Sequence, residues 1–375
     1  MAPLLPAYTH AGPCCYSLTH FFTLISICMQ STMMMSDKTK YYLDLEEKYG
    51  AHNYHPLPVV LTRGQGVFVW DVDNKRYYDF LSGYSAVNQG HCHPAIVAAL
   101  MEQAQQLTLT SRAFHSELLS EYTQFITTYF GYDKVLPMNT GVEAVETAIK
   151  LCRRWGYDVK GIPSNKAKIL VCTNNFHGRT STVISFSTDP SSYDRFGPFM
   201  PGFEVVPYND LTALATALQD KNVAGLLVEP IQGEAGVVIP DDGYLASAKQ
   251  YCEDAQVLFI ADEIQTGLCR TGKMLACDYE GVRADILIIG KALSGGTLPV
   301  SAVLAADAIM LNIKPGEHGS TYGGSPWPVK WPWLHSMYCV MKKMAENAME
   351  MGQLFRQELQ ALNSPILKQF VEKGF

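Results

Sequence analysis

The middle of the chain alternates short apolar runs with segments of helical periodicity. Five runs of four or five residues are almost wholly apolar, at 168–172, 225–229, 257–261, 286–289 and 300–304. Continuous apolar runs of this length are typical of strands buried on both faces, and the helical segments between them supply the covering layers. The pattern therefore predicts an α/β fold with a largely parallel sheet.

An N-terminal hairpin is predicted ahead of these runs. Residues 66–70 and 77–80 are rich in aromatic and β-branched side chains and flank the turn residues Asp73 and Asn74. Helical spacing follows at 94–106 and 118–130. We expect 37–85 to form an N-terminal segment, 86–324 a large domain and 325–375 a small one.

Composition excludes several classes of protein. The net charge of -7 gives no global basic field for nucleic acid. The chain has no apolar run near the roughly 20 residues that span a bilayer, so we expect no integral membrane protein. The charged fraction of 17% is low, which favours a packed protein with a large buried interface.

The ten cysteines are candidates for disulfides or a zinc site, and the cluster His91-Cys92-His93 is a candidate metal site. No CxxC pair is present, so we expect reduced cysteines packed as small core residues. Neighbouring side chains of an extended segment point to opposite faces, and this favours a loop ending at Pro94 over a metal site. We expect no metal.

Four polar residues follow the predicted strands directly. Glu229 ends one run, Asp262 and Glu263 follow another, and Lys291 lies two residues after Ile289. Parallel sheets bind ligands beyond the carboxyl ends of their strands, so the four are expected to converge there.

A phosphate-binding helix start is predicted at Thr140. Thr140 and Glu143 fit a capping box, and Gly141 allows a ligand to approach the backbone. The first N–H groups of a helix carry partial positive charge, which suits a phosphate.

Lys291 and Asp262 point to one cofactor. A lysine beside an apolar sheet is desolvated, so its neutral amine is favoured and can form a Schiff base with an aldehyde. A carboxylate such as Asp262 keeps a pyridine nitrogen protonated. With the helix start at Gly141, these residues predict pyridoxal 5'-phosphate. P-loop and dinucleotide motifs are incomplete at Gly290-Lys291 and at 64–66.

The chain resembles the class III (fold-type I) pyridoxal-phosphate-dependent aminotransferases from about Lys38 to Gly324. The matching stretches are 139–144, 175–180, 229–234, 262–267 and 290–293. The resemblance implies a mostly parallel seven-stranded sheet with helices on both faces, plus a small α+β domain. It also implies a homodimer.

The resemblance further implies roles for individual residues. Lys291 would bond the cofactor and move the substrate proton, and Asp262 would pair with the ring nitrogen. Six more residues would bind the cofactor: Gly141, Val142, Phe176 and Gln265, with Ser320 and Thr321 reaching the phosphate of the neighbouring subunit.

Within the family, the resemblance is strongest to members that transfer the δ-amino group of L-ornithine to 2-oxoglutarate by ping-pong kinetics. It assigns the substrates to Tyr54, Tyr84, Arg179 and Glu234. Members that use acetylornithine or 4-aminobutyrate, or an inactive homologue, remain alternatives. Family members of this kind are mitochondrial matrix enzymes.

Both ends depart from the family pattern. Residues 1–36 carry no charged side chain, so we expect a disordered leader and leave a cytoplasmic location open. Three prolines and three tryptophans at 325–333 cannot form the helix that the family has there. We interpret 325–341 as a frame slip or altered splice and the chain as truncated, without the family arginine that pairs with Glu234.

Overall fold

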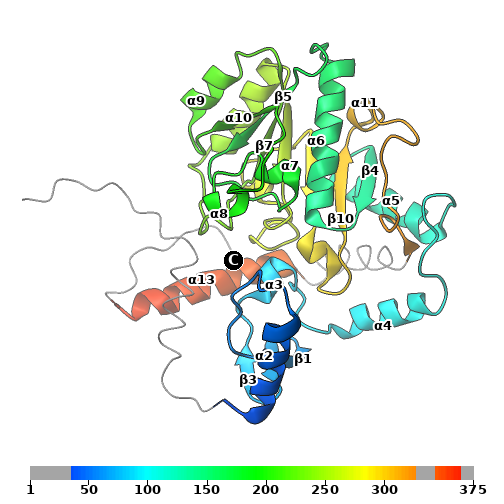
Figure 1. The fold of residues 1–375 in the computed structure, drawn as a ribbon. Helices are drawn as coiled ribbons and strands as arrows, with labels where there is room; N and C mark the ends of the chain where they lie inside the picture. Colours follow the sequence, from blue (N-terminus) through cyan, green and yellow to red (C-terminus); the bar gives the residue numbers. More distant parts are fainter. Residues whose placement is uncertain (1–34, 327–342, 365–375) are drawn as a thin grey trace, which may run out of the picture.

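The computed structural model describes residues 35–326 and 343–364 of the chain. Most of the predicted leader and of the aberrant segment lies outside these ranges. A seven-stranded sheet forms the centre, in the order β4-β10-β9-β8-β7-β5-β6 (Figure 1). Its strands are β4 Lys134–Met138, β5 Lys168–Cys172, β6 Phe203–Val206, β7 Val223–Val228, β8 Leu258–Asp262, β9 Ile286–Ile289 and β10 Ser301–Ala305.

The sheet is parallel except at β10. Strands β6, β5, β7, β8 and β9 pair in parallel, whereas β10 pairs antiparallel with both β9 and β4. The predicted largely parallel sheet is confirmed. Strands β4 and β6 and the reversed direction of β10 were not predicted from the apolar runs.

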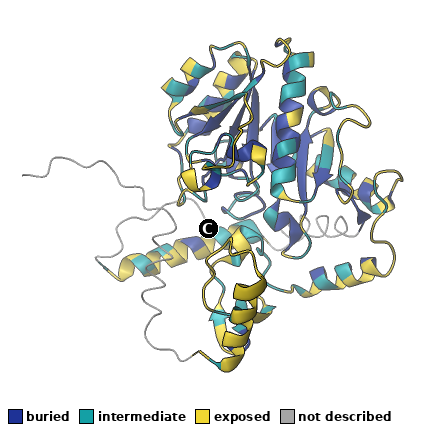
Figure 2. Cartoon of the chain, in the orientation of Figure 1, coloured by how far each residue is buried: buried dark blue, intermediate teal, exposed yellow. Residues whose placement is uncertain are grey.

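Helices cover both faces of the sheet. One face packs against the buried side of α6 Gly141–Asp158 and against α7 Ser181–Ile184 and α11 Asp307–Met310. The other packs against α5 Glu117–Phe130, α9 Leu211–Ala217 and α10 Tyr244–Asp254. Strands β7 to β10 are buried along their whole length, which matches their unbroken apolar sequences (Figure 2).

The N-terminal segment is a separate, thinner layer. It holds α2 Asp37–Tyr49, the three-stranded sheet β1 Leu61–Gln65, β2 Phe68–Asp71 and β3 Arg76–Tyr78, and α3 Ser82–Ser85. The predicted hairpin is β2 and β3, which pair antiparallel. Helix α4 Pro94–Ala104 then leads towards the large sheet. In contrast to the central strands, α2 is exposed along most of its length (Figure 2).

Four short helices and one long helix complete the described chain. They are α8 Pro190–Tyr193, the 3-10 helices η1 Ala276–Tyr279 and η2 Lys291–Ser294, α11 and the C-terminal α13 Met344–Ala361. Helix α13 reaches the N-terminal segment, where the rings of Phe80 and Phe355 lie 6.5 Å apart.

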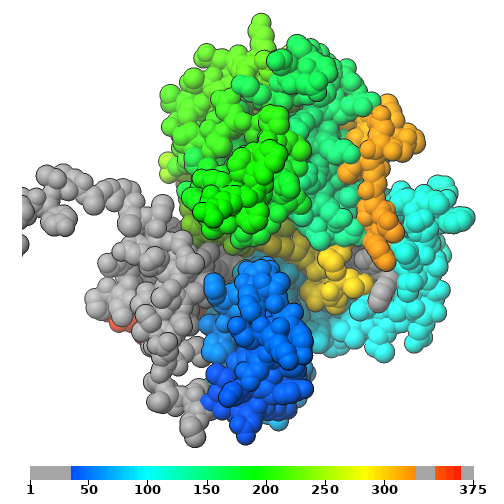
Figure 3. All heavy atoms as spheres, viewed as in Figure 1, coloured from blue at the N-terminus to red at the C-terminus, as the bar shows by residue number. Residues whose placement is uncertain are grey.

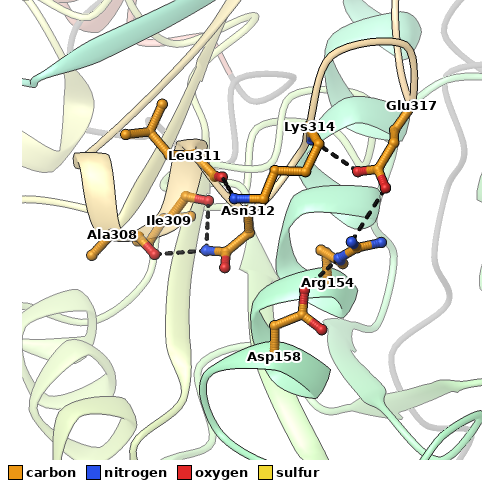
Figure 4. Close-up of polar contacts among 8 residues, drawn as sticks. All are labelled: Arg154, Asp158, Ala308, Ile309, Leu311, Asn312, Lys314 and Glu317. Atoms are coloured by element: carbon orange, nitrogen blue, oxygen red, sulfur yellow. Dashed lines mark hydrogen bonds and ion pairs between the residues drawn. The ribbon is translucent and has the colours of Figure 1, made fainter.

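The chain returns over α6 after β10 and so carries Ser320 to the amino end of that helix. Arg154 of α6 donates to Glu317 Oε1 at 3.2 Å, and Glu317 Oε2 accepts the Lys314 N–H at 2.8 Å (Figure 4). Asn312 Nδ2 donates to the carbonyl oxygens of Ala308 and Ile309 in the same turn (Figure 4). These contacts fasten the loop that leads to Ser320.

Candidate active site

A cavity of about 180 Å³ opens at the carboxyl ends of the central strands, beside the start of α6. Parallel strands bring their carboxyl ends to one edge of the sheet, and this places residues distant in sequence in one pocket. Six of the eight predicted cofactor residues line it. The lining is Gly141, Val142, Phe176, His177, Gly178, Glu229, Ile231, Asp262, Ile264, Gln265, Thr266 and Lys291.

Lys291 enters the cavity from an unusual backbone conformation. It follows the fully buried strand β9 and Gly290, and it opens η2 with a left-handed φ of 41°. Such a conformation is costly for a residue with a side chain and is enriched at functional sites. Burial lowers the pKa of Lys291, and the charge of Arg270 lowers it further, against the opposing effect of the nearby carboxylates Glu234, Asp262 and Glu229.

Asp262 is buried at the end of β8, and both of its oxygens have partners. Oδ1 accepts the Ile264 N–H at 3.1 Å, and Oδ2 lies 2.6 Å from Nδ1 of the buried His177. Burial opposes a charged imidazole, but the hydrogen bond with Asp262 outweighs it, so the pKa of His177 is raised. The contact with Asp262 therefore favours a protonated imidazole at His177.

Glu229 lies behind this pair as a second buried carboxyl group. Its Oε1 accepts the Phe176 N–H at 2.9 Å, which fixes the backbone that carries the Phe176 ring. Burial raises the pKa of Glu229 to about 7, with a further rise from Asp262 and opposing effects of His177 and Lys291. Glu229 therefore keeps its proton to a higher pH than a solvated glutamate does.

The start of α6 has the predicted capping box. Glu143 N–H donates to Thr140 Oγ1 at 3.4 Å, and Glu143 Oε2 accepts the Thr140 N–H at 2.7 Å. The N–H groups of Gly141 and Val142, in the first turn, have no acceptor within the helix and line the cavity. A Cβ at Gly178, where φ is 120°, would lie 2.5 Å from Val142, so this approach requires glycine.

A loop after β8 brings Gln265 towards Glu234. Gln265 Nε2 donates to Glu234 Oε1 at 3.4 Å. A Cβ on Gly233 would lie 2.1 Å from Gln265 Oε1, so a larger residue here would displace the Gln265 amide. The two predicted residues are therefore neighbours at the mouth of the cavity.

Glu263 does not converge with the other strand-end groups, contrary to our expectation. Its side chain is buried and accepts the N–H groups of Ala276 at 3.0 Å and Cys277 at 2.8 Å. It also accepts the Thr266 hydroxyl. Successive residues of a strand point to opposite faces, so Asp262 faces the cavity while Glu263 fastens the 264–277 loop.

The remaining predicted residues lie outside this cavity. Tyr54 and Tyr84 of the N-terminal segment are 70% and 48% exposed. Arg179 is exposed, and its guanidinium lies 5.5 Å from the centre of the Phe176 ring. Ser320 Oγ accepts from Asn139 Nδ2 at 2.8 Å, just before α6, and Thr321 is exposed beside it.

The sequence analysis gave no role to four residues that shape the site. His177 contacts Asp262, Ile231 and Ile264 supply apolar walls, and Arg270 acts on Lys291. His177 stood in a stretch that matches the family pattern, but its contact with Asp262 spans 85 positions. Sequence periodicity carries no signal for such a pairing.

The groups in the cavity fit pyridoxal 5'-phosphate. The unpaired N–H groups of the α6 start suit a phosphate, the buried Asp262 carboxylate suits a pyridinium nitrogen, and the Lys291 amine suits an aldehyde. The Phe176 ring and Ile264 supply apolar surface for a flat ring. Each chemical part of the cofactor thus has a matching group in this chain.

Other kinds of site are not evident within residues 35–326 and 343–364. No group of three or more His, Cys, Asp or Glu side chains in these ranges could hold a metal ion. Six cysteines in the same ranges form no disulfide bond, and Cys92 is the exposed one among them. None of the helices described there is long and apolar enough to cross a membrane.

Comparisons with known proteins agree with this chemistry. The sequence model of the family "Aminotransferase class-III" matches residues 49–374. The mitochondrial ornithine aminotransferase of Rattus norvegicus is 58% identical over 349 residues, which is 93% of this chain and 80% of that protein.

Solved structures show the same similarity. The ornithine aminotransferase of Toxoplasma gondii ME49 superimposes with a TM-score of 0.88 at 44% identity, covering 94% of this chain and 83% of that one. The acetylornithine aminotransferase of Elizabethkingia anophelis superimposes with a TM-score of 0.79 at 59% identity, covering 86% and 80%. The chain therefore belongs to the class III aminotransferases.

Proposed function

We propose that this chain is a pyridoxal-phosphate-dependent ornithine δ-aminotransferase. It would transfer the δ-amino group of L-ornithine to 2-oxoglutarate, giving glutamate-5-semialdehyde, which cyclises, and glutamate. One observation carries the proposal: a desolvated lysine, a buried aspartate and a helix start share one cavity. The identity of 58% to the rat ornithine enzyme supports ornithine as the amino donor.

The proposal assigns the cofactor to residues of the cavity. The N–H groups of Gly141 and Val142 would hold the phosphate, and Asp262 the ring nitrogen. Gln265 would donate to the ring oxygen, and Phe176 would stack on the ring. When bound, pyridoxal 5'-phosphate supplies an aldehyde that bonds amines covalently and a ring that withdraws electrons from the bonded carbon.

Lys291 then acts as the proton carrier of the reaction. Its lowered pKa increases the share of neutral amine at Nζ, and only the neutral amine can accept a proton. Nζ would take a proton from the δ-carbon of ornithine, and water would supply the aldehyde oxygen of the product. In the second half, Nζ would return a proton to the carbon that becomes the α-carbon of glutamate. The two half-reactions predict ping-pong kinetics.

His177 and Asp262 together would keep a negative charge beside the ring nitrogen of the cofactor. The imidazole at 2.6 Å stabilises the Asp262 carboxylate in a site from which water is largely excluded. An ionised Asp262 would keep the ring nitrogen protonated. His177 would therefore act through Asp262.

The substrates would meet residues at the mouth of the cavity. Arg179, whose planar guanidinium fits a carboxylate, would hold the carboxylate of the oxo acid. Tyr54 and Tyr84 would hold the amino acid so that its distal amine meets the cofactor. Glu234, beside Gln265, would contribute to the choice between the two substrates.

We also infer a homodimer. Ser320 and Thr321 do not line the cavity of their own chain, and the proposal places them at the phosphate of the second subunit. The N-terminal segment also exposes large aromatic side chains, among them Tyr49 at 73% and Phe80 at 84%. Burial of such a surface is the usual reason for a stable dimer. Sedimentation analysis at micromolar concentration tests this inference, and a monomer at all concentrations would contradict it.

A mitochondrial location is inferred from the relatives. The rat relative is named as mitochondrial. Fractionation of cells that express the full chain tests this, and recovery in the cytosol alone would contradict it.

Donor preference tests the reaction itself. We expect cofactor-loaded protein to use ornithine with a kcat/KM at least tenfold above that for N-acetylornithine or 4-aminobutyrate, with 2-oxoglutarate as acceptor. Preference for N-acetylornithine would instead support an acetylornithine aminotransferase as the second candidate function. The 59% identity to the Elizabethkingia enzyme is the observation that favours this candidate. If the absorbance of the bound cofactor changes with none of these amino donors, the chain is an inactive homologue.

A further inference from the structure

The segment Ser82–Asn88, which contains Tyr84, has an energetically unfavourable backbone conformation. Four consecutive residues from Ser82 to Ser85 have φ between 51° and 70°, and three of them are not glycine. Left-handed conformations of residues with side chains persist only where the surrounding structure fixes them. The contacts that hold this segment therefore decide where Tyr84 lies.

The segment lies directly against the part of the site that carries Lys291. Helix α3 packs on η2, and a Cβ on Gly296, just after η2, would lie 3.1 Å from Val87. The N-terminal segment (blue) meets the chain around residue 290 (yellow) in Figure 3. A shift of Ser82–Asn88 would therefore alter the surroundings of Lys291 as well as the position of Tyr84.

Arg270 holds both ends of this segment from the loop after β8. Its Nη2 donates to Asn88 Oδ1 at 2.7 Å and to Ser82 Oγ at 3.2 Å. Asn88 Nδ2 in turn donates to the carbonyl oxygen of Leu268 at 3.1 Å. Asp79 supports one end only, by accepting the Leu81 and Ser82 N–H groups at 2.9 Å.

Arg270 is an unusual cation for a protein interior. Burial lowers its pKa, no carboxylate among the described residues pairs with it, and its buried Nε has no hydrogen-bond partner there. An unpaired buried charge is costly, so another requirement must offset this cost. Two are visible: the bonds to Ser82 and Asn88, and the effect of its charge on Lys291.

We infer that Arg270 is a positioning residue, which fixes the Ser82–Asn88 segment, and with it Tyr84, against the wall of the site beside Lys291. The inference rests on the proposed function where it concerns the amino donor. It does not rest on that function where it concerns the conformation of the segment. Arg270 itself need not touch the substrate.

Amide hydrogen exchange of the full chain without substrates tests the conformational part. The N–H groups of Ala86 and Val87 donate to the Ser82 carbonyl, and that of Tyr84 donates to the Leu81 carbonyl just before the segment, so amide exchange reports directly on its conformation. We expect Arg270→Gln to speed exchange in peptides covering 82–90 at least tenfold. Arg153→Gln is the matched control, because Arg153 also has a buried unpaired Nε and fastens a loop, at the Pro201 carbonyl, away from the site.

Two further variants separate geometry from charge and from general destabilisation. Asn88→Ala removes one acceptor of Arg270 and is expected to speed exchange in the same peptides. Arg270→Lys keeps the charge, but its ammonium nitrogen ends one bond short of Nη2, the atom that donates to both Ser82 and Asn88, so its exchange is expected to match that of Arg270→Gln. Unchanged amide exchange at 82–90 in Arg270→Gln would overturn the inference. Should Arg270→Gln not fold, unchanged exchange at 82–90 in Asn88→Ala would overturn it. A wild-type rate of amide exchange in Arg270→Lys would overturn the role of the two hydrogen bonds from Arg270 to Ser82 and Asn88.

Kinetics test the consequence for the site. We expect Arg270→Gln to raise KM for ornithine at least tenfold while bound cofactor per chain stays at the wild-type value. Faster exchange with an unchanged KM would overturn the link to Tyr84. Should the wild-type chain transfer no amine, the proposed function would fail while the exchange result would still decide the conformational role of Arg270.

Discussion

The central sheet and the N-terminal segment contribute to the site in different ways. The cofactor groups stand at the ends of strands that are buried along their whole length, and Asp262 is only 5% exposed. Tyr54 and Tyr84, which we propose to bind substrate, come from a thin layer in which most side chains of α2 face solvent (Figure 2). The cofactor pocket is thus largely formed within one chain, whereas the substrate-binding side depends on contacts between layers. Variants in each region should therefore fail differently.

The largest effect is expected at Lys291. Lys291→Ala removes the group that we propose bonds the cofactor and carries the proton, so kcat should fall by about 10⁴-fold or more. Stopped-flow absorbance with ornithine measures this loss. Lys160→Ala is the control, because burial also lowers the pKa of Lys160, but its Nζ donates to Val223 and Ala255 carbonyls at the opposite end of the sheet. Equal losses in both variants would contradict the assignment.

Asp262→Asn tests whether charge, rather than shape, matters at the ring nitrogen. The amide keeps the size of the side chain but removes its negative charge, and we expect kcat to fall roughly 10²- to 10³-fold. The absorbance spectrum of the bound cofactor should change as well. Asp285→Asn, which alters a paired carboxylate at the other end of the sheet, should leave the spectrum as it is. An unchanged spectrum in Asp262→Asn would count against the proposed pairing.

Glu229→Gln tests the buried carboxyl group through pH. In the folded chain Glu229 loses its proton at a pKa of about 7, and in the unfolded chain at 4.5. The folded state thus binds the proton more tightly, and wild-type stability declines as pH rises from 4.5 to 7. Glutamine cannot ionise, so the variant should gain up to about 3 kcal/mol at pH 8 and almost nothing below pH 4.5. Denaturant titrations of cofactor-free protein measure this, and a gain that is independent of pH would contradict the account.

The smallest expected effect is at Tyr84. Tyr84→Phe removes one hydroxyl, whose loss from a polar contact costs about 1 kcal/mol, so KM for ornithine should rise by about five- to tenfold. Cofactor content should not change, because the cofactor pocket lies in the sheet. Tyr78→Phe, at another exposed tyrosine of the same segment, serves as the control. Loss of cofactor in Tyr84→Phe would show that the two regions are not separable.

In the central sheet, the sequence predicted the strands that form unbroken apolar runs and missed those that do not. Strands β5 and β9 lie where they were expected, but β4 contains Pro137 and β6 contains Glu204, so neither reads as an apolar run. The sequence pattern also cannot give strand direction, and β10 runs opposite to its neighbours. The division into domains at residues 85 and 324 stays a prediction.

The expectation that ligands bind beyond the carboxyl ends of parallel strands located most of the site. It could not show which side chains contact one another. It grouped Glu263 with Asp262, although alternation along the chain turns Glu263 towards the loop at Ala276. The contacts of His177 with Asp262 and of Arg270 with Asn88 join residues 85 and 182 positions apart. Only the folded chain brings these groups together, so local spacing contains no trace of them.

Covalent trapping of the reactive amine tests the central claim most directly. Cofactor-loaded protein would be reduced with borohydride, digested, and the labelled peptide identified by mass spectrometry. The account predicts one labelled site, Lys291, and no label at the likewise desolvated Lys160. A label on Lys160 or any other lysine, or none at all, would contradict it.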